Sequence, residues 1–259
     1  MSDTGPSARY YVSNARMQSY FMLGLSIQYC LALTFGITLQ RLGSGADGPL
    51  ATEKEEADAR KQDQKVAAIR LKEIDRFIKE AKNDPVDAEE LDILYRQRGD
   101  QHLILEEYAI AFDDYTMAIE HHKRPWTPTL LLRVRAALGK GDDLQAVKDL
   151  EAASQSEAYR PYSQAVLAII YAKSQDGRVK NPQAALKRAE SARQIAGDQT
   201  EIALSERALA AAQSANKDFG KAVIHQQKCI DATSGKISSI LTRELEAYRS
   251  GKETPYFLK

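Results

Sequence analysis

The sequence lacks several features that mark particular protein classes. It has only two cysteines, Cys30 and Cys229, in segments far apart along the chain, so we expect two small buried residues and no disulfide. Lys plus Arg and Asp plus Glu are 36 each, whereas a general nucleic-acid-binding protein needs an excess of basic residues to meet phosphate. Glycine and proline are few and cluster between apolar segments. The composition favours a folded, helix-rich protein with no nucleic-acid partner.

Motifs of catalysis and metal binding are absent from the sequence as well. It contains no HExxH, GxSxG or CxxC. His121 and His122 are adjacent at a predicted helix end, point about 100° apart, and are poorly placed to chelate one metal. We interpret Asp113–Asp114 and Asp142–Asp143 as helix-start and turn carboxylates. We therefore expect no enzymatic activity, no cofactor or metal, and no small-molecule substrate.

One long run without charge lies near the N-terminus. Residues 17–40 carry no charged side chain and are bracketed by Arg16 and Arg41, and about 20 such residues suffice to cross a bilayer as a helix. We favour a single membrane-spanning anchor over residues 17–41, in contact with lipid. A cleaved signal peptide is less favoured, because the preceding segment, residues 1–16, is long and no small-x-small cleavage site follows. A buried helix of a soluble domain is the third interpretation.

A stripe of small or hydroxylated residues runs along this segment at a spacing of four. It consists of Ser26, Cys30, Thr34 and Thr38. Such a face suits close contact with another helix in a bilayer, although weakly apolar spans carry Ser and Thr in any case. The few basic residues around the run lean towards a cytoplasmic N-terminus, which would place the rest of the chain outside the cytoplasm.

The segment after the run predicts a linker and a long helix. Residues 42–62 are first glycine-rich and then highly charged, typical of a flexible linker followed by a solvated helical lead-in. Apolar residues then recur at helical spacing until Lys82–Pro85 ends the pattern. They are Val66, Ile69, Ile74, Phe77 and Ile78. We expect this face to cap the first repeat, and a partner-binding amphipathic helix is the alternative.

Pairs of small residues recur four times with the same internal step. The pairs are Ala111/Ala118, Ala146/Ala153, Ala185/Ala192 and Ala222/Cys229, each seven residues apart. Successive pairs lie 35, 39 and 37 residues apart. A repeat of this length predicts stacked helical hairpins, with the small residues letting two helices approach closely.

Residues 92–248 resemble a tetratricopeptide-repeat array. In the first unit Gly99 precedes Ala111, Tyr115 and Ala118, a small residue in one helix followed by small–aromatic–small in the next. The longer turn over residues 175–182 resembles Sel1-like repeats, and residues 244–257 are similar to the ending of many bacterial tetratricopeptide proteins. The chain departs from the pattern by lacking the first-helix Trp and often the Gly.

The resemblance implies an all-α solenoid. It comprises about four hairpins and a capping helix over residues 63–249, preceded by the transmembrane helix and followed by a tail, residues 250–259. The implied setting is a bacterial-type cell membrane, and the implied activity is protein binding. The first helix of each hairpin then lines a concave groove. Candidate groove residues are Arg96, Asp100, Arg135, Tyr162, Lys173 and Arg207.

Arginines at matching depth suit an acidic or C-terminal peptide, although solvated groove walls carry arginine in any case. The loop over residues 175–182 is a second candidate contact. We predict a membrane-anchored protein that mediates protein–protein interaction as a scaffold, adaptor or assembly factor. A structural accessory subunit of a large membrane complex, or a regulator of a separately encoded membrane enzyme, is the alternative.

Overall fold

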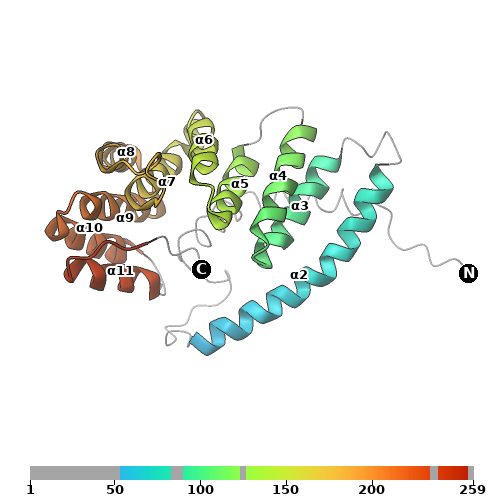
Figure 1. The fold of residues 1–259 in the computed structure, drawn as a ribbon, viewed down its shortest axis with the longest axis horizontal. Helices are drawn as coiled ribbons and strands as arrows, with labels where there is room; N and C mark the ends of the chain where they lie inside the picture. Colours follow the sequence, from blue (N-terminus) through green and yellow to red (C-terminus); the bar gives the residue numbers. More distant parts are fainter. Residues whose placement is uncertain (1–52, 83–89, 123–126, 234–238, 256–259) are drawn as a thin grey trace, which may run out of the picture. The chain divides into compact units, whose positions relative to one another are not determined.

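The computed structural model describes residues 53–82, 90–122, 127–233 and 239–255. Over these ranges the protein is all-α, with ten α-helices packed in chain order as antiparallel pairs (Figure 1), which confirms the predicted fold class at this level. None of the described helices combines the length and the apolar character that crossing a bilayer requires. The predicted membrane segment, with Ser26, Cys30, Thr34 and Thr38, lies outside the described residues.

The described residues form two compact units, one ending at Lys140 and the other beginning at Gly141. The first contains α2 (Glu53–Ala81), α3 (Leu91–Ile104), α4 (Tyr108–His121) and α5 (Thr127–Lys140). Each of these helices packs on the next. Ile74, Phe77 and Ile78 of α2 bury their side chains against Leu94 and Tyr95 of α3. The prediction that the first long helix packs on the first repeat is confirmed for this end of α2.

The buried face of α2 differs in part from the predicted stripe. Val66 and Ile69 are 36% and 65% exposed, whereas Ala67 is buried and Leu71 is half-buried. The buried side chains follow steps of four and three residues back from Ile78, which lead through Ile74 to Leu71 and Ala67. The prediction for Val66 and Ile69 was wrong because these two apolar residues lie beside the buried face of α2, not on it.

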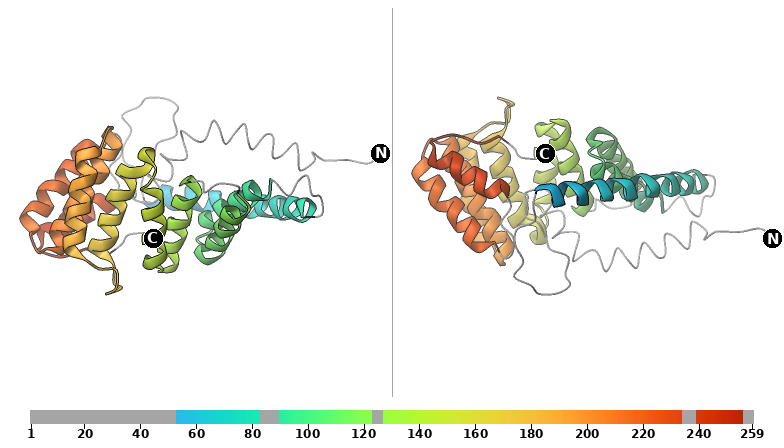
Figure 2. Two further views of the ribbon diagram at one scale, coloured as in Figure 1. Left: turned by 90° about the horizontal axis from the view of Figure 1, so that it is seen from above. Right: turned by 90° about the horizontal axis from the view of Figure 1, so that it is seen from below.

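The second unit contains the other six α-helices and one short 3-10 helix. They are α6 (Asp143–Ala153), η2 (Glu157–Tyr159), α7 (Arg160–Lys173), α8 (Pro182–Ile195), α9 (Gln199–Ala215), α10 (Phe219–Ala232) and α11 (Ser239–Arg249). Helices α7 to α11 lie side by side, drawn from yellow to red in both views of Figure 2.

Asx side chains set the starts of four helices in this unit. Asp142, Asn181, Asp198 and Asp218 each accept a hydrogen bond from a backbone N–H of the first turn of the helix that follows. Pro182 occupies the first turn of α8, where a missing N–H costs nothing. The turn carboxylate predicted at Asp142 is therefore confirmed, and the predicted longer turn over residues 175–182 ends where α8 begins.

The second helix of each predicted hairpin carries the same three buried positions. We call these twelve residues the packing seam: Ala111, Tyr115 and Ala118; Ala146, Leu150 and Ala153; Ala185, Ala189 and Ala192; and Ala222, Gln226 and Cys229. No residue of the seam is more than 3% exposed. All four predicted pairs of small residues therefore lie in the core, as their spacing indicated.

A glycine marks the close approach of α4 and α5. A Cβ atom added at Gly139 would lie 2.2 Å from Cδ1 and 2.3 Å from Cγ of Tyr108. Ring atoms next to the Tyr108 backbone have little freedom to move away. Gly139 lies inside α5, where the ring of Tyr108 covers it.

We expect Gly139→Ala to destabilise the protein by about 1–3 kcal/mol, because the added methyl group overpacks the contact with Tyr108. Alanine is otherwise the better helix former, so without the contact with Tyr108 the substitution would stabilise the protein. In a Tyr108→Ala background the cost should disappear. The control is Gly177→Ala, since a Cβ at Gly177 meets nothing within 4 Å. Urea unfolding of the parent and of these variants measures the effect, and a Gly139→Ala chain as stable as the parent would refute the close contact.

Candidate functional site

Three of the six predicted groove residues gather in the first unit. Arg96 and Asp100 of α3 form an ion pair with 3.9 Å between Nη1 and Oδ2. The hydroxyl of Tyr115, a seam residue, donates to Asp100 Oδ1 at 2.8 Å. Burial raises the pKa of Asp100, while Arg96, this hydrogen bond and Arg135 of α5 act in the opposite direction. Arg96, Asp100 and Arg135 thus form one charged cluster on the first helices of two predicted hairpins.

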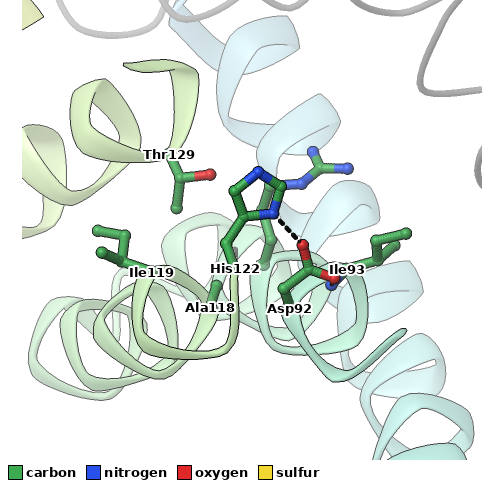
Figure 3. A pocket seen from close by; sticks show the side chains of 7 residues that line it. Asp92, Ile93, Ala118, Ile119, His122 and Thr129 are labelled. Atoms are coloured by element: carbon green, nitrogen blue, oxygen red, sulfur yellow. Dashed lines mark hydrogen bonds and ion pairs between the residues drawn. The ribbon is translucent and has the colours of Figure 1, made fainter. Parts of the chain in front are cut away.

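A small pocket lies beside this cluster, between α3, α4 and α5 (Figure 3). Its volume of about 10 Å³ leaves room for about one water molecule. His122 Nδ1 is bonded to Asp92 at the mouth, with Thr129 of α5 opposite. The adjacent His121 turns away and stacks on Tyr95 with 5.6 Å between ring centroids. The two histidines therefore have separate partners, in line with the angle expected between them.

In three of the four predicted hairpins, the residue three positions after the first seam residue bonds to a side chain of another helix. Asp114 is 2% exposed and accepts from Nε of Arg98 on α3 at 3.0 Å. His225 Nδ1 lies 2.7 Å from Glu206 Oε2 on α9. Arg188 donates to Gln164 of α7 at 3.0 Å. The expectation that Asp114 is a helix-start carboxylate was wrong, because α4 begins at Tyr108 and Asp114 lies inside the helix, where its side chain pairs with Arg98.

The second unit holds a buried ionic cluster built around Glu244 of α11. Glu244 is fully buried. Arg207 of α9 donates through Nε to Glu244 Oε2 at 2.8 Å and through Nη2 to Oε1 at 2.9 Å. Lys173 Nζ at the end of α7 also contacts Glu244 Oε1. The seam residue Gln226 donates Nε2 to Oε2 at 3.2 Å. One carboxylate therefore joins α7, α9, α10 and α11.

The charges of this cluster hold Glu244 ionised. Burial alone would raise the pKa of Glu244, but Arg207 and Lys173 outweigh it through charge and hydrogen bonds and lower the pKa to about 2. Burial would lower the pKa of Arg207, but Glu244 overcomes it and raises that pKa. The nearby thiol of Cys229 is free, and burial raises its pKa to about 12, so it stays protonated.

The other three predicted groove residues are buried in the second unit. Tyr162, Lys173 and Arg207 are 6%, 6% and 3% exposed. The structure gives Lys173 and Arg207 a structural partner, Glu244, because burying two cations requires a counter-charge. The groove itself stays a prediction, and the six residues form two groups, one in each unit.

Sequence reasoning missed Glu244 and its pairing with Lys173 and Arg207. A signal was present, since Leu241, Leu245 and Tyr248 mark the buried face of α11 and Glu244 falls on the same face. A charged residue on a buried helix face predicts a buried counter-charge, but its identity is not encoded nearby. Lys173 lies 71 residues away.

Across the described parts of the chain, no group of three or more His, Cys, Asp or Glu side chains is arranged to hold a metal ion. No protein-family model, curated protein sequence or solved structure matches the chain.

We expect Glu244→Gln to destabilise the protein by about 3–5 kcal/mol, because it leaves the buried Arg207 and Lys173 without a counter-charge of matching geometry. The matched control is Glu246→Gln on the same helix, whose side chain is 61% exposed and pairs with Arg249. That substitution should change stability by no more than about 0.5 kcal/mol. Equal urea midpoints for the two variants would contradict the structural role of Glu244.

The same carboxylate predicts a loss of stability in acid. Its pKa lies at about 2 in the folded chain and at the ordinary value of 4.5 in the unfolded chain. The unfolded state therefore binds more protons between these values, so the contribution of Glu244 is full above pH 4.5 and is lost as the pH falls towards 2. Urea unfolding at several pH values should show a steeper decline for the parent chain than for Glu244→Gln. Parallel curves would refute the assignment.

Proposed function

We propose that the chain is a tetratricopeptide-like repeat protein that binds other proteins and is held at a membrane, as a scaffold, adaptor or assembly factor. The observation that carries the proposal is the packing seam. Four second helices bury the same three positions, so each hairpin uses one face for packing and leaves other faces for contacts. Arrays of this kind present extended surfaces suited to partner chains.

The charged cluster of the first unit supports protein binding. Arg96 and Arg135 lie around Asp100 on the first helices of two successive hairpins, where a bound segment would meet both. Arginine is suited to carboxylates because its guanidinium donates two parallel hydrogen bonds. Asp100 reduces the net charge of the cluster, so an acidic segment would have to compete with it.

The membrane part of the proposal rests on the sequence. The uncharged run over residues 17–40 has the length of a transmembrane helix, and the glycine-rich residues after it would separate the array from the bilayer. A tether of this kind raises the local concentration of the array near membrane-bound partners.

We expect the full chain to remain with membranes in an alkaline wash that removes peripheral proteins. The double variant Ile27→Arg with Leu31→Arg should shift to the supernatant, because each arginine near the middle of a span costs about 2.5–3.5 kcal/mol. The matched control, Gly43→Arg with Gly45→Arg, adds the same charge in the linker and should stay in the pellet. A parent chain found in the supernatant would contradict the membrane anchor.

Native-gel migration after mild detergent extraction separates the two forms of the proposal. A scaffold or adaptor should migrate as a monomer or small oligomer, with partners retained only after crosslinking. Quantitative migration with one large assembly would instead favour the accessory-subunit alternative.

A further inference from the structure

The chain folds back on itself directly after α11. Gly251 has φ +67°, a left-handed conformation that glycine adopts without strain. The Lys252 N–H donates to Ala247 O at 2.9 Å, and the Gly251 N–H donates to Tyr248 O at 3.0 Å. This is the Schellman arrangement that ends a helix and reverses the chain. Residues 252–255, which we call the tail segment, therefore return over the second unit.

Side chains of three lysines hold the tail segment. Glu253 accepts from Lys180 Nζ at 3.0 Å and is also bonded to Lys217 Nζ. Thr254 is 6% exposed, and its hydroxyl accepts from Lys173 Nζ at 2.8 Å. Lys173 belongs to α7, Lys180 to the loop before α8, and Lys217 to the turn between α9 and α10. We call these three lysines the lysine strip.

The contacts around the tail segment carry more positive than negative charge. Lys173 and Arg207 share the single carboxylate of Glu244. Lys180 and Lys217 share the single carboxylate of Glu253. Four cations thus meet two carboxylates in these contacts, so the strip suits an occupant with negative charge. The tail segment supplies one carboxylate, from Glu253, and one hydroxyl, from Thr254, to these lysines.

The outer contacts of the tail segment are of a kind that exchanges readily. The Lys217 side chain is 70% exposed, and its pair with Glu253 contributes little because water screens it. The covalent link to α11 gives the tail segment an effective concentration on the order of millimolar at the strip. A competing segment must therefore bind the lysine strip with higher affinity than the tail segment does, or be held near the strip at a comparable concentration.

We propose that the lysine strip is a peptide-binding surface, that the tail segment occupies it at rest, and that an acidic segment of a partner protein with a Glu-Thr pair displaces the tail segment. This inference rests on the proposed function, protein binding by the array, and adds the chemistry of the partner and a built-in competitor. The buried hydroxyl contact of Thr254 sets the register, and the carboxylate contact of Glu253 supplies the charge.

The test uses a fluorescein-labelled peptide with the sequence of residues 250–259, SGKETPYFLK, and the full chain in detergent. In the Glu253→Ala, Thr254→Ala double variant the tail loses its hold while the strip is intact, so the peptide should bind about tenfold or more tighter than to the parent. The matched control, Lys252→Ala, changes an exposed tail residue and should bind like the parent. Adding Lys180→Ala and Lys217→Ala to the double variant should abolish the gain.

Deuterium uptake of residues 250–255 in the parent chain gives a readout that needs no variant. Saturating peptide should raise this uptake, whereas a peptide with Ala in place of the Glu-Thr pair should leave it unchanged. Equal peptide affinity for the parent and the double variant, or unchanged uptake with the Glu-Thr peptide, would overturn the proposal. If that result is obtained while the chain stays in the membrane fraction and still crosslinks to partner proteins, the proposed function is unaffected. If the peptide displaces the tail segment as expected but no partner protein associates with the chain, the result would count against the proposed function alone.

Discussion

Close approach of paired helices at small side chains is the constraint on which the rest of the structure depends. Nine of the twelve seam residues are alanine or cysteine, so the neighbouring helix comes near the backbone and dispersion contacts are dense. Tyr115 and Leu150 fill the wider gaps of the first two hairpins. Because the seam is closed to solvent, its polar groups must find partners inside the protein. The Tyr115 hydroxyl does so with Asp100, and the amide nitrogen of Gln226 does so with Glu244.

Gln226 marks the point where the seam meets the buried ions of the second unit. A buried ionic cluster of this kind does not in general make a protein more stable than an apolar core of the same volume. Its consequence is positional, since Glu244 fixes the ends of Arg207 and Lys173, and Lys173 in turn reaches Thr254. The register of the tail segment is thereby tied to the packing of α7, α9 and α11.

The parts of this fold that follow local rules could be predicted from the sequence, whereas those that depend on distant partners could not. The four pairs of small residues and the turn carboxylate Asp142 were recognisable because each has a fixed spacing or a local hydrogen bond. The stripe on α2 was misjudged at Val66 and Ile69 because apolar residues lie on both sides of the buried face there, and that face runs through Ala67 and Leu71. Lys173 and Arg207 were recognised as notable residues, but their role depends on Glu244, and no local pattern connects the three.

The uneven spacing of the repeats is explained in part by the contacts of the tail segment. The 39-residue interval adds the loop over residues 175–182 between α7 and α8. This loop is held in place: Val179 is buried, its N–H donates to Asp176 O at 2.9 Å, and the Asn181 N–H donates to Tyr171 O at 2.8 Å. Lys180, between these anchors, is therefore presented in a fixed position. A preorganised cation loses little entropy when it binds a carboxylate, so the added residues place a charge where Glu253 meets it and where an acidic partner segment would meet it as well.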